Sequence, residues 1–543
     1  MKSVAAIFIL ITVFYINIPA QPNYPGAHRQ PKLVVGLIVE NMRPDYIQRY
    51  WDKFGNDGFR KLYTQGAVHS NINMTQHIQS YATGTATLFT GVHPSVHGII
   101  GKTWYDRFKG KEAECTSDDY YFTVGADGEW GNASARKLLS NTISDNLKIF
   151  TGGKAYVYSV AMNRETAIFS AGHSADGAYW LDPVSGRMIS SSFYVNTFPE
   201  WIRDFNVVNY PKIYSTRNWV TLLTEREYTE SVADNYLFEK GYFGKYKTFP
   251  HKLGQYTRLT KDFNPLKTTP YANLIIKDFA IKLLENEPVG EDDITDFITF
   301  AFSSMDYEYG SFGPVSLEMQ DSYLHLDKYI GELITFIENR YGKNNVLFYL
   351  TSNTSASYPV DYLKEEFKLP VDYFSPENAI ALLTSFLNIT YGQDKWIEYY
   401  DEAQIYLNHN LIKKNNISLA EIGNETSSFF NQFEGVQLSL TKDQAGAGDA
   451  STGPLSAIIQ SYFKNRSGDI FYILKEGWQP SYKYKKINYT DQSHIPLVFY
   501  GPEIKPQIIK EKNNAIDILP TLCDFINIPY PDKCQGSSIN FIK

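Results

Sequence analysis

Cysteine is scarce in this chain of 543 residues, which contains only Cys115, Cys523 and Cys534. Three cysteines cannot form a disulfide framework, and their spacing is not that of a zinc knuckle. Cys523 and Cys534 lie near enough in sequence to pair in an oxidising compartment, but two separate thiols explain them equally well. The sequence therefore leaves this pair undecided.

An excess of positive charge is missing as well. Lysine and arginine number 51 against 59 acidic residues, which gives a net charge of −8 at pH 7. This balance argues against a general binder of nucleic acid or of anionic membranes. Hydrophobic residues make up 43% of the chain and charged residues 20%, which excludes disordered and collagen-like classes and indicates a globular protein with a sizeable core.

Long apolar runs are absent beyond the N-terminus. Residues 1–20 combine Lys2, the run Val4–Ile18 and the small residue Ala20, which is the pattern of a secretory signal peptide. The alternative is a membrane anchor, which needs roughly 20 apolar residues, and this run is shorter. We therefore expect an exported protein, periplasmic or secreted, whose mature chain has no transmembrane segment.

Several apolar runs have the continuous hydrophobicity of strands that are buried on both faces of a parallel sheet. They are Pro31–Val39, Phe297–Ser304, Asn345–Leu350 and His494–Gly501. Three of these runs lead to a polar residue, namely Glu40, Asp306 and Asn353. Because ligands bind at the carboxyl ends of strands in open α/β sheets, these three residues are candidates for one site.

Helical periodicity appears between the apolar runs, at Ser134–Phe150, Asp321–Tyr341 and Asn514–Ile526. The alternation predicts an α/β fold, a three-layer sandwich with a mainly parallel sheet. We expect residues 32–173 and 291–543 to form its core. The segment 174–290 is rich in tyrosine and tryptophan with weaker periodicity, so it is predicted to be an inserted cap and the first place to look for a partner surface.

An ordered series of motifs runs through the chain. It begins with Lys32–Ile47, continues through Phe89-Thr90-Gly91, His97-Gly98-Ile99 and Ala171-Gly172-His173, and ends with Asn465–Ile470, His494–Gly501 and Asp517–Leu522. The series resembles the alkaline phosphatase superfamily in its type I phosphodiesterase/nucleotide pyrophosphatase branch, and is most similar to the bacterial exported alkaline phosphatases of that branch. The resemblance implies an alkaline-phosphatase-like sandwich and phosphoester hydrolysis.

The resemblance also implies two zinc ions, held by carboxylates and histidines, and a threonine that attacks phosphorus. In this sequence the nucleophile position is Tyr81, with Ser80 and Thr83 as the neighbouring hydroxyls. Glu40 stands at the position of the first aspartate ligand, and Asp306 is retained at a second ligand position.

The remaining ligand positions have lost their chemistry. Gly310 stands in place of a histidine, and Asn353-Thr354 stands in place of an Asp-His pair. The segment Tyr482–Lys486 has no histidine where the last ligand is expected, and its Lys485 is either a partner of Asp306 or a solvated loop lysine. We therefore expect no bound cofactor, with Glu40, Asp306 and Asn353 as vestigial metal positions.

The substrate-holding positions of the family correspond to Lys102, Met162 and Arg164, where only the arginine is unchanged. Arg164 and Lys102 are thus the candidate substrate-binding residues. Taken together, the replacements favour a non-catalytic member of the family, an exported binding or scaffold protein for an unidentified protein or anionic ligand. The alternative is a metal-dependent phosphoester hydrolase with a rebuilt active site that uses zinc, and a third hypothesis is metal-free chemistry at Tyr81 or Ser80.

Overall fold

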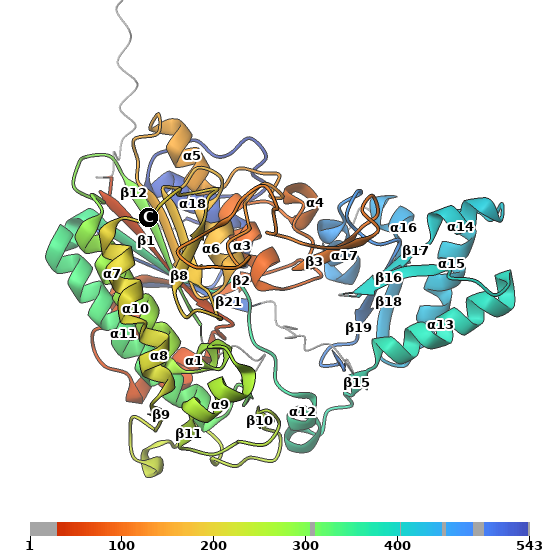
Figure 1. The fold of residues 1–543 in the computed structure, drawn as a ribbon, viewed down its shortest axis with the longest axis horizontal. Coiled ribbons are helices and arrows are strands. Elements are labelled where there is room, and N and C mark those ends of the chain that lie inside the picture. The colour runs from red at the N-terminus through yellow and green to blue at the C-terminus, as the bar shows by residue number, and fades with distance from the viewer. Residues whose placement is uncertain (1–29, 304–309, 402, 448–451, 482–493, 541–543) are drawn as a thin grey trace, which may run out of the picture.

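The computed structural model describes residues 30–303, 310–401, 403–447, 452–481 and 494–540. Within them, an 11-stranded sheet has the order β22-β2-β21-β14-β1-β12-β6-β7-β8-β5, and β23 pairs with β2 (Figure 1). The strands of this sheet are β1 (Leu33–Glu40), β2 (Ala67–Asn73), β5 (Thr123–Val124), β6 (Val157–Ala161), β7 (Gly177–Leu181), β8 (Met188–Ser191), β12 (Asp296–Ser303), β14 (Val346–Thr351), β21 (His494–Tyr500), β22 (Gln507–Ile509) and β23 (Asn513–Asn514).

The centre of the sheet, β14-β1-β12-β6-β7, is parallel, while β21 and β8 run antiparallel to their neighbours β14 and β7. β1 is buried along its whole length. Its residues Leu33, Val35 and Leu37 pack on one side, and Val34 and Ile38 pack on the other. This alternation explains why the strand is hydrophobic without a break, since both faces of the sheet are covered.

Helices cover both faces, so the predicted α/β fold with a largely parallel sheet is confirmed. One face carries α1 (Asp45–Arg49), α2 (Phe59–Gln65), α7 (Glu200–Val208), α8 (Tyr210–Ser215), α9 (Leu253–Thr260), α10 (Pro270–Asn286) and α11 (Leu317–Tyr341). The other carries α3 (Tyr81–Thr90), α5 (Ile143–Phe150), α6 (Arg164–Ala171) and α18 (Ile518–Phe525), with the short α4 (Pro94–His97) after α3.

Short strands pair outside the main sheet as β3 (Thr103–Asp106) with β4 (Lys111–Glu114), β9 (Asn218–Trp219) with β11 (His251–Lys252), and β10 (Gly241–Tyr242) with β13 (Gly310–Ser311).

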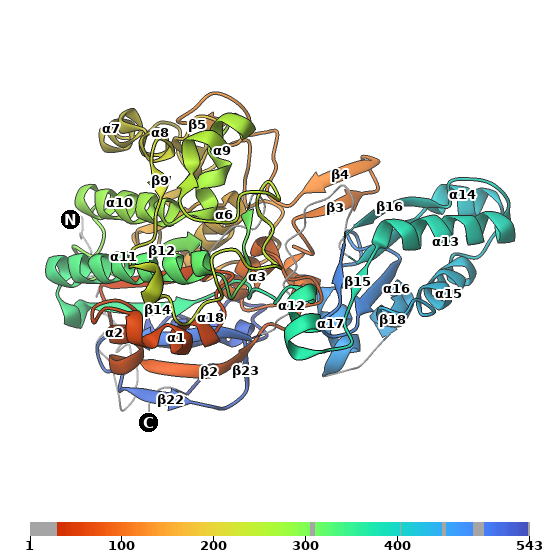
Figure 2. The same ribbon diagram turned by 90° about the horizontal axis from the view of Figure 1, so that it is seen from below.

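A small lobe, residues 373–480, lies between β14 and β21 in sequence and projects to one side of the main body (Figures 1 and 2). It has its own sheet, β16-β17-β19-β18, and its own apolar core. Its elements are β15 (Tyr373–Phe374), α13 (Pro376–Tyr391), β16 (Ile397–Asp401), β17 (Gln404–Leu407), α14 (His409–Lys414), α15 (Leu419–Phe430), β18 (Val436–Thr441), α16 (Lys442–Ala447), α17 (Gly453–Ser461), β19 (Ile470–Leu474) and β20 (Gln479–Pro480). The first strand of the lobe, β15, pairs with its last strand, β20, so the two ends of the lobe lie side by side. In sequence the lobe begins shortly after α12 (Val360–Phe367).

The division into a core and a cap at 174–290 stays a prediction. Within that segment, β7 and β8 belong to the main sheet, and α10 packs against β12 in the main core. The small lobe at 373–480 was not anticipated from the sequence.

Two predicted helices begin elsewhere than expected. α5 starts at Ile143 rather than Ser134, because Thr142 and Asp145 form a reciprocal capping box that fixes its first turn. α11 starts at Leu317 rather than Asp321, with Ser316 as the cap. The third predicted helix, Asn514–Ile526, is shorter than expected: a 3₁₀ turn precedes α18, which begins at Ile518, and Pro520 lies in the first turn of α18, where no amide hydrogen is needed.

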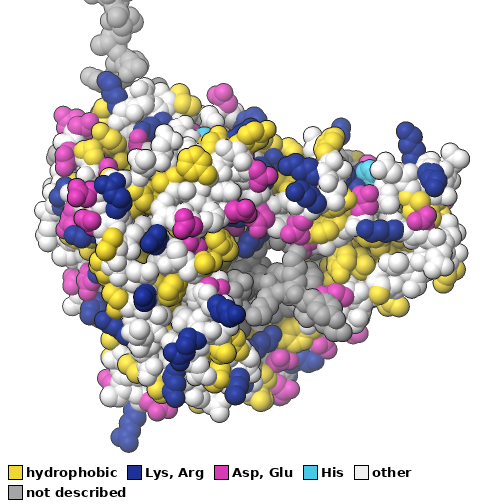
Figure 3. All heavy atoms as spheres, viewed as in Figure 1, with side chains coloured by type: hydrophobic (Ala, Val, Ile, Leu, Met, Phe, Trp, Pro, Cys, Tyr) yellow, Lys and Arg dark blue, Asp and Glu magenta, His cyan; other side chains and the backbone are white. Residues whose placement is uncertain are grey.

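Further findings concern the membrane-spanning helices, the predicted signal peptide, the surface charge and the cysteines. No helix within the described ranges is long and apolar enough to cross a membrane. Residues 1–20, the predicted signal peptide, lie outside the described residues. On the face shown in Figure 3, basic and acidic side chains are interspersed rather than gathered by sign. All three cysteines are free thiols, so Cys523 and Cys534 are not joined.

Candidate active site

Glu40 is the last residue of β1 and is 1% exposed. Its Oε2 accepts a hydrogen bond from Asn163 Nδ2 at 2.7 Å, and its Oε1 accepts one from the Thr166 hydroxyl. Asn163 is the N-cap residue of α6, and Thr166 lies in the first turn of that helix. The parallel pairing of β1, β12 and β6 therefore brings the start of α6 to the end of β1.

Tyr81 is the first residue of α3, and its hydroxyl accepts a hydrogen bond from Asn41 Nδ2 at 2.7 Å. Asn41 directly follows Glu40, with a φ of 59°, in the left-handed region that asparagine tolerates better than most residues. The turn after β1 thus points Asn41 at the helix start that carries Tyr81.

The other two hydroxyls at this helix start have a structural task. Ser80 is the N-cap of α3, and its Oγ accepts a hydrogen bond from the Thr83 amide at 3.2 Å. Thr83 Oγ1 in turn accepts one from the Ser80 amide at 2.9 Å. Because the capping box occupies both hydroxyls, Tyr81 remains the candidate for the nucleophile position.

Asn353 and Thr354 follow β14 and are fully or almost fully buried. Asn353 Nδ2 donates to Thr85 Oγ1 at 3.0 Å and to Thr166 Oγ1 at 3.3 Å, so Asn353 and Glu40 share Thr166 as a partner. Thr354 Oγ1 donates to Asn41 Oδ1 at 2.8 Å.

This loop lies very close to α3 at Gly84. A Cβ atom there would come within 1.7 Å of the Asn353 carbonyl oxygen, which is far inside van der Waals contact. The close approach of α3 to the end of β14 therefore requires glycine at this position.

Glu40, Tyr81 and Asn353, far apart in sequence, are thus joined by hydrogen bonds through Asn41, Thr354 and Thr166. Asp306 and the segment Tyr482–Lys486, with Lys485, lie outside the described residues. Sequence reasoning missed Asn41, Asn163 and Thr166, although an asparagine directly after a strand end and polar residues at a helix start were available signals.

The candidate substrate-binding residues lie beside this network. Arg164 is the first residue of α6; its Nη2 donates to Glu114 Oε2 at 2.5 Å, and its Nε is buried with no hydrogen-bond partner among the described residues. Lys102 is exposed, whereas Met162 is 1% exposed within the core.

The pKa of Glu165, the residue next to Arg164, reflects the charges of the side chains around it. Burial acts to raise the pKa of Glu165, but the nearby charges of Lys102, Arg164 and Lys267 outweigh it and hold this pKa below its usual value. Cations from three separate segments therefore converge on the start of α6. Such a cluster suits an anionic phosphoryl group.

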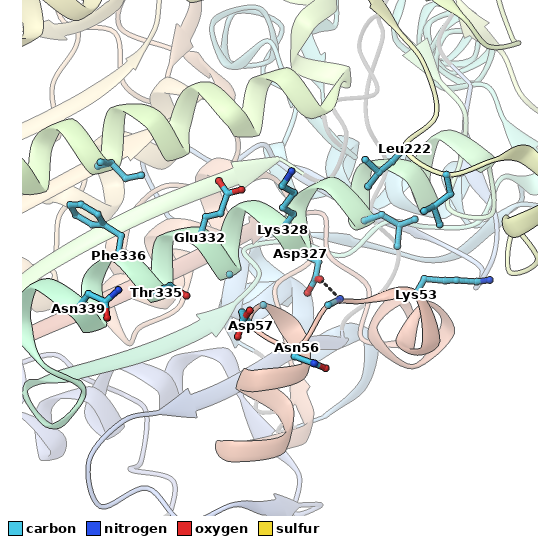
Figure 4. A pocket seen from close by; sticks show the side chains of 16 residues that line it. Lys53, Asn56, Asp57, Leu222, Asp327, Lys328, Glu332, Thr335, Phe336 and Asn339 are labelled. Carbon is cyan, nitrogen blue, oxygen red and sulfur yellow. Dashed lines mark hydrogen bonds between the residues drawn. The ribbon is translucent and has the colours of Figure 1, made fainter.

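A cleft of about 640 Å³ lies elsewhere, along α11 (Figure 4). Asp327 fixes its edge by accepting hydrogen bonds from the amides of Gly55 and Phe59, each at 2.7 Å. The lining includes Leu222 and Phe336 but none of the residues of the strand-end network. This cleft is therefore separate from the candidate active site.

The described residues do not fit a two-zinc centre. Among them, no group of three or more histidine, cysteine, aspartate or glutamate side chains lies close enough to hold a metal ion. The donors around Glu40 and Asn353 are amides and hydroxyls, which are poor zinc ligands.

The fold, together with the ordered motifs along the chain, defines a protein of the alkaline phosphatase superfamily. The chain belongs to the family described as type I phosphodiesterase / nucleotide pyrophosphatase, whose family model matches residues 34–495. The resemblance inferred from the motifs is therefore confirmed.

Individual relatives match along almost the whole chain. The alkaline phosphatase PafA of Elizabethkingia meningoseptica is 33% identical, with 94% of each chain covered, and PhoV of Synechococcus elongatus is 31% identical over 96% of this chain and 94% of its own. A Myroides odoratus protein named calcium-transporting ATPase is 31% identical, with 94% of each chain covered. The crystal structure of PafA superimposes with a TM-score of 0.89 at 31% identity, over 95% of this chain and all of that one.

These relatives correct our functional prediction. We expected a non-catalytic binding or scaffold protein, but full-length relatives named alkaline phosphatases at 31–33% identity favour a phosphoester hydrolase. The expectation that no cofactor is bound is contradicted by the same relatives, because alkaline phosphatases of this family depend on zinc. The chain keeps its similarity to these relatives along almost its whole length although the ligand positions are replaced, so the replacements alone do not indicate a loss of activity.

Proposed function

We propose that this chain is a phosphoester hydrolase whose active site has been rebuilt at the carboxyl ends of β1 and β14. The proposal is supported by the family match and by the relatives that cover the chain. Its central observation is the hydrogen-bonded network that links Glu40, Tyr81 and Asn353 beside the cations at the start of α6.

In this proposal Tyr81 occupies the nucleophile position. Asn41 Nδ2 donates to the phenolic oxygen, so it orients the ring and stabilises negative charge on that oxygen. Tyr81 is also the first residue of α3, where the helix dipole favours an anion. Arg164 and Lys102 hold the phosphoryl group, whose negative charge they offset.

Turnover is expected to depend on a metal ion, and the described residues alone do not supply a complete set of ligands for one. Among the residues that the structure describes, Glu40 is the carboxylate that stands at a metal-ligand position of the family. Asp306, Glu308 and Asp491 are carboxylates outside the described residues, and they are the first further candidates for a metal-dependence test.

The test is an assay of purified protein with an aryl phosphomonoester and an aryl phosphodiester, with and without added zinc, alongside elemental analysis. Turnover above background is expected, and it should fall in Asp306→Ala if it depends on metal. Tyr81→Phe should abolish turnover while Tyr120→Phe, at an exposed tyrosine, leaves it unchanged. Wild-type protein without turnover on either ester, with or without metal, would refute the proposal.

We further propose that the chain is exported, on the signal-peptide pattern of residues 1–20. Amino-terminal sequencing of the protein recovered from the cell exterior or periplasm tests this. A mature chain that begins near residue 21 is expected, and retention of residues 1–20 on cytoplasmic protein would contradict it.

A further inference from the structure

Lys267 is a cation of the candidate active site that no sequence motif singled out. It lies in the 3₁₀ helix η3 (Asn264–Thr268), far in sequence from Lys102 and Arg164. Its ammonium nitrogen lies 3.4 Å from Asn163 Oδ1, and the other end of the same amide donates to Glu40 at 2.7 Å. One asparagine side chain therefore links Lys267 to the carboxylate at the end of β1.

The backbone around Lys267 is held in place on both sides. Leu266 is 1% exposed in the main core. The Thr268 hydroxyl is buried and lies 2.6 Å from the Tyr242 hydroxyl and 2.8 Å from the Pro265 carbonyl oxygen. Because these neighbours are fixed while the Lys267 side chain is only half-buried, the long side chain can adjust its ammonium group towards a ligand.

The position that the family resemblance assigns to a lysine is Met162 here. Met162 follows β6, is 1% exposed and packs in the core, so it brings no charge to the site. Lys267 reaches Asn163, the very next residue, from a different segment of the chain. The charge missing at position 162 is thus supplied close by.

We propose that Lys267 binds the non-bridging oxygens of a phosphomonoester substrate, in place of the lysine missing at position 162. The inference rests on the proposed function. A phosphomonoester dianion carries one more negative charge than a phosphodiester, so a third cation beside Arg164 and Lys102 favours the monoester. The 3.4 Å contact between Lys267 and Asn163 is long for a hydrogen bond and is readily exchanged for a phosphoryl oxygen.

The test compares three variants of the full-length protein. Lys267→Met removes the charge but keeps the apolar stem, Lys267→Arg keeps the charge, and Lys212→Met removes an exposed lysine of α8 as the matched control. For Lys267→Met we expect kcat/KM for 4-nitrophenyl phosphate to fall about tenfold or more, because one charge-assisted hydrogen bond is lost. The value for methyl 4-nitrophenyl phosphate should change much less, and Lys267→Arg should retain most monoester activity.

Inorganic phosphate gives a readout that does not need turnover. Its affinity, measured by titration calorimetry on folded protein, should fall in Lys267→Met but not in Lys212→Met. If wild-type protein turns over the monoester and Lys267→Met does so equally well, the inference is wrong while the proposed function stands. If wild-type protein does not turn over at all, the proposed function fails, and equal phosphate affinity in wild type and Lys267→Met overturns the inference as well.

Discussion

Two carboxylates, Glu40 in the main body and Asp469 where the small lobe joins it, are both almost fully buried but are held by different partners. Glu40 accepts hydrogen bonds from an asparagine amide and a threonine hydroxyl. Asp469 is surrounded by basic side chains from three segments. Arg107 Nη2 donates to Asp469 Oδ2 at 2.6 Å, while Lys442 Nζ and His409 Nε2 each lie 2.8 Å from its Oδ1.

These different partners indicate that Asp469 has a structural role, whereas Glu40 belongs to the candidate active site. Burial acts to raise the pKa of Asp469, but the hydrogen bond from His409 and the charges of Arg107 and Lys442 outweigh it and hold this pKa far below its usual range. Arg107 follows the hairpin strand β3 of the main body, whereas Lys442 and His409 belong to the lobe, so Asp469 ties the two parts together. Glu40 instead sits where strand ends and helix starts meet, which is where open α/β sheets bind ligands.

The largest expected effect is on stability, from Asp469→Asn. The amide removes the negative charge and leaves Arg107, Lys442 and His409 beside a neutral group. Breaking such a buried ion-pair cluster by losing one partner should lower the free energy of unfolding by about 3 kcal/mol. Urea unfolding measures this.

The matched control for that change is Asp443→Asn, at an exposed aspartate next to Lys442. It should alter the free energy of unfolding by less than about 0.5 kcal/mol. If both variants unfold at the wild-type urea concentration, Asp469 does not hold the lobe, and the contrast with Glu40 fails.

For Glu40→Gln we expect the main loss to be in activity rather than in stability. An amide cannot accept from both Asn163 and Thr166 as the carboxylate does, and it removes the negative charge from a family ligand position. We expect kcat/KM for an aryl phosphate to fall about 100-fold. Folded Asp469→Asn, assayed well below its melting temperature, serves as the comparison and should keep wild-type activity, so full activity in Glu40→Gln would contradict the assignment.

The fold of the main body was predictable because its buried parallel strands are unbroken apolar runs, as in β1 and β14. The candidate site was predictable in part, since Glu40 ends β1 and Asn353 lies just beyond the end of β14. The small lobe was not predicted because its strands are short, and two of them, β16 and β18, are partly exposed, so they lack a long unbroken apolar run. Lys267 escaped because only the folded chain brings η3 to Asn163.

Acid should weaken the contribution of Asp469 to stability. A carboxylate with a lowered folded-state pKa stabilises the fold fully above its unfolded pKa, and the stabilisation is lost as the pH falls towards the folded value. The gap in unfolding free energy between wild type and Asp469→Asn should therefore be constant near neutral pH and narrow below about pH 4. Urea unfolding at a series of pH values measures it, and a gap that is as wide at about pH 3 as at neutral pH would contradict this account.

The smallest effect concerns the shape of the cation rather than its charge. Arg107 donates through Nη2 to Asp469 and through Nη1 to the Leu407 carbonyl oxygen at 3.1 Å, a pair of contacts that needs a planar fork. Lysine keeps the charge but cannot span both acceptors, so Arg107→Lys should lower the free energy of unfolding by about 1 kcal/mol. Arg136→Lys is the control, because its ion pair with Asp118 is 3.4 Å long and half of its side chain is exposed. If Arg107→Lys is as stable as wild type, the positive charge of residue 107 is enough to hold Asp469. The contact between the lobe and the main body would then depend on electrostatic attraction rather than on the hydrogen bonds that Arg107 donates.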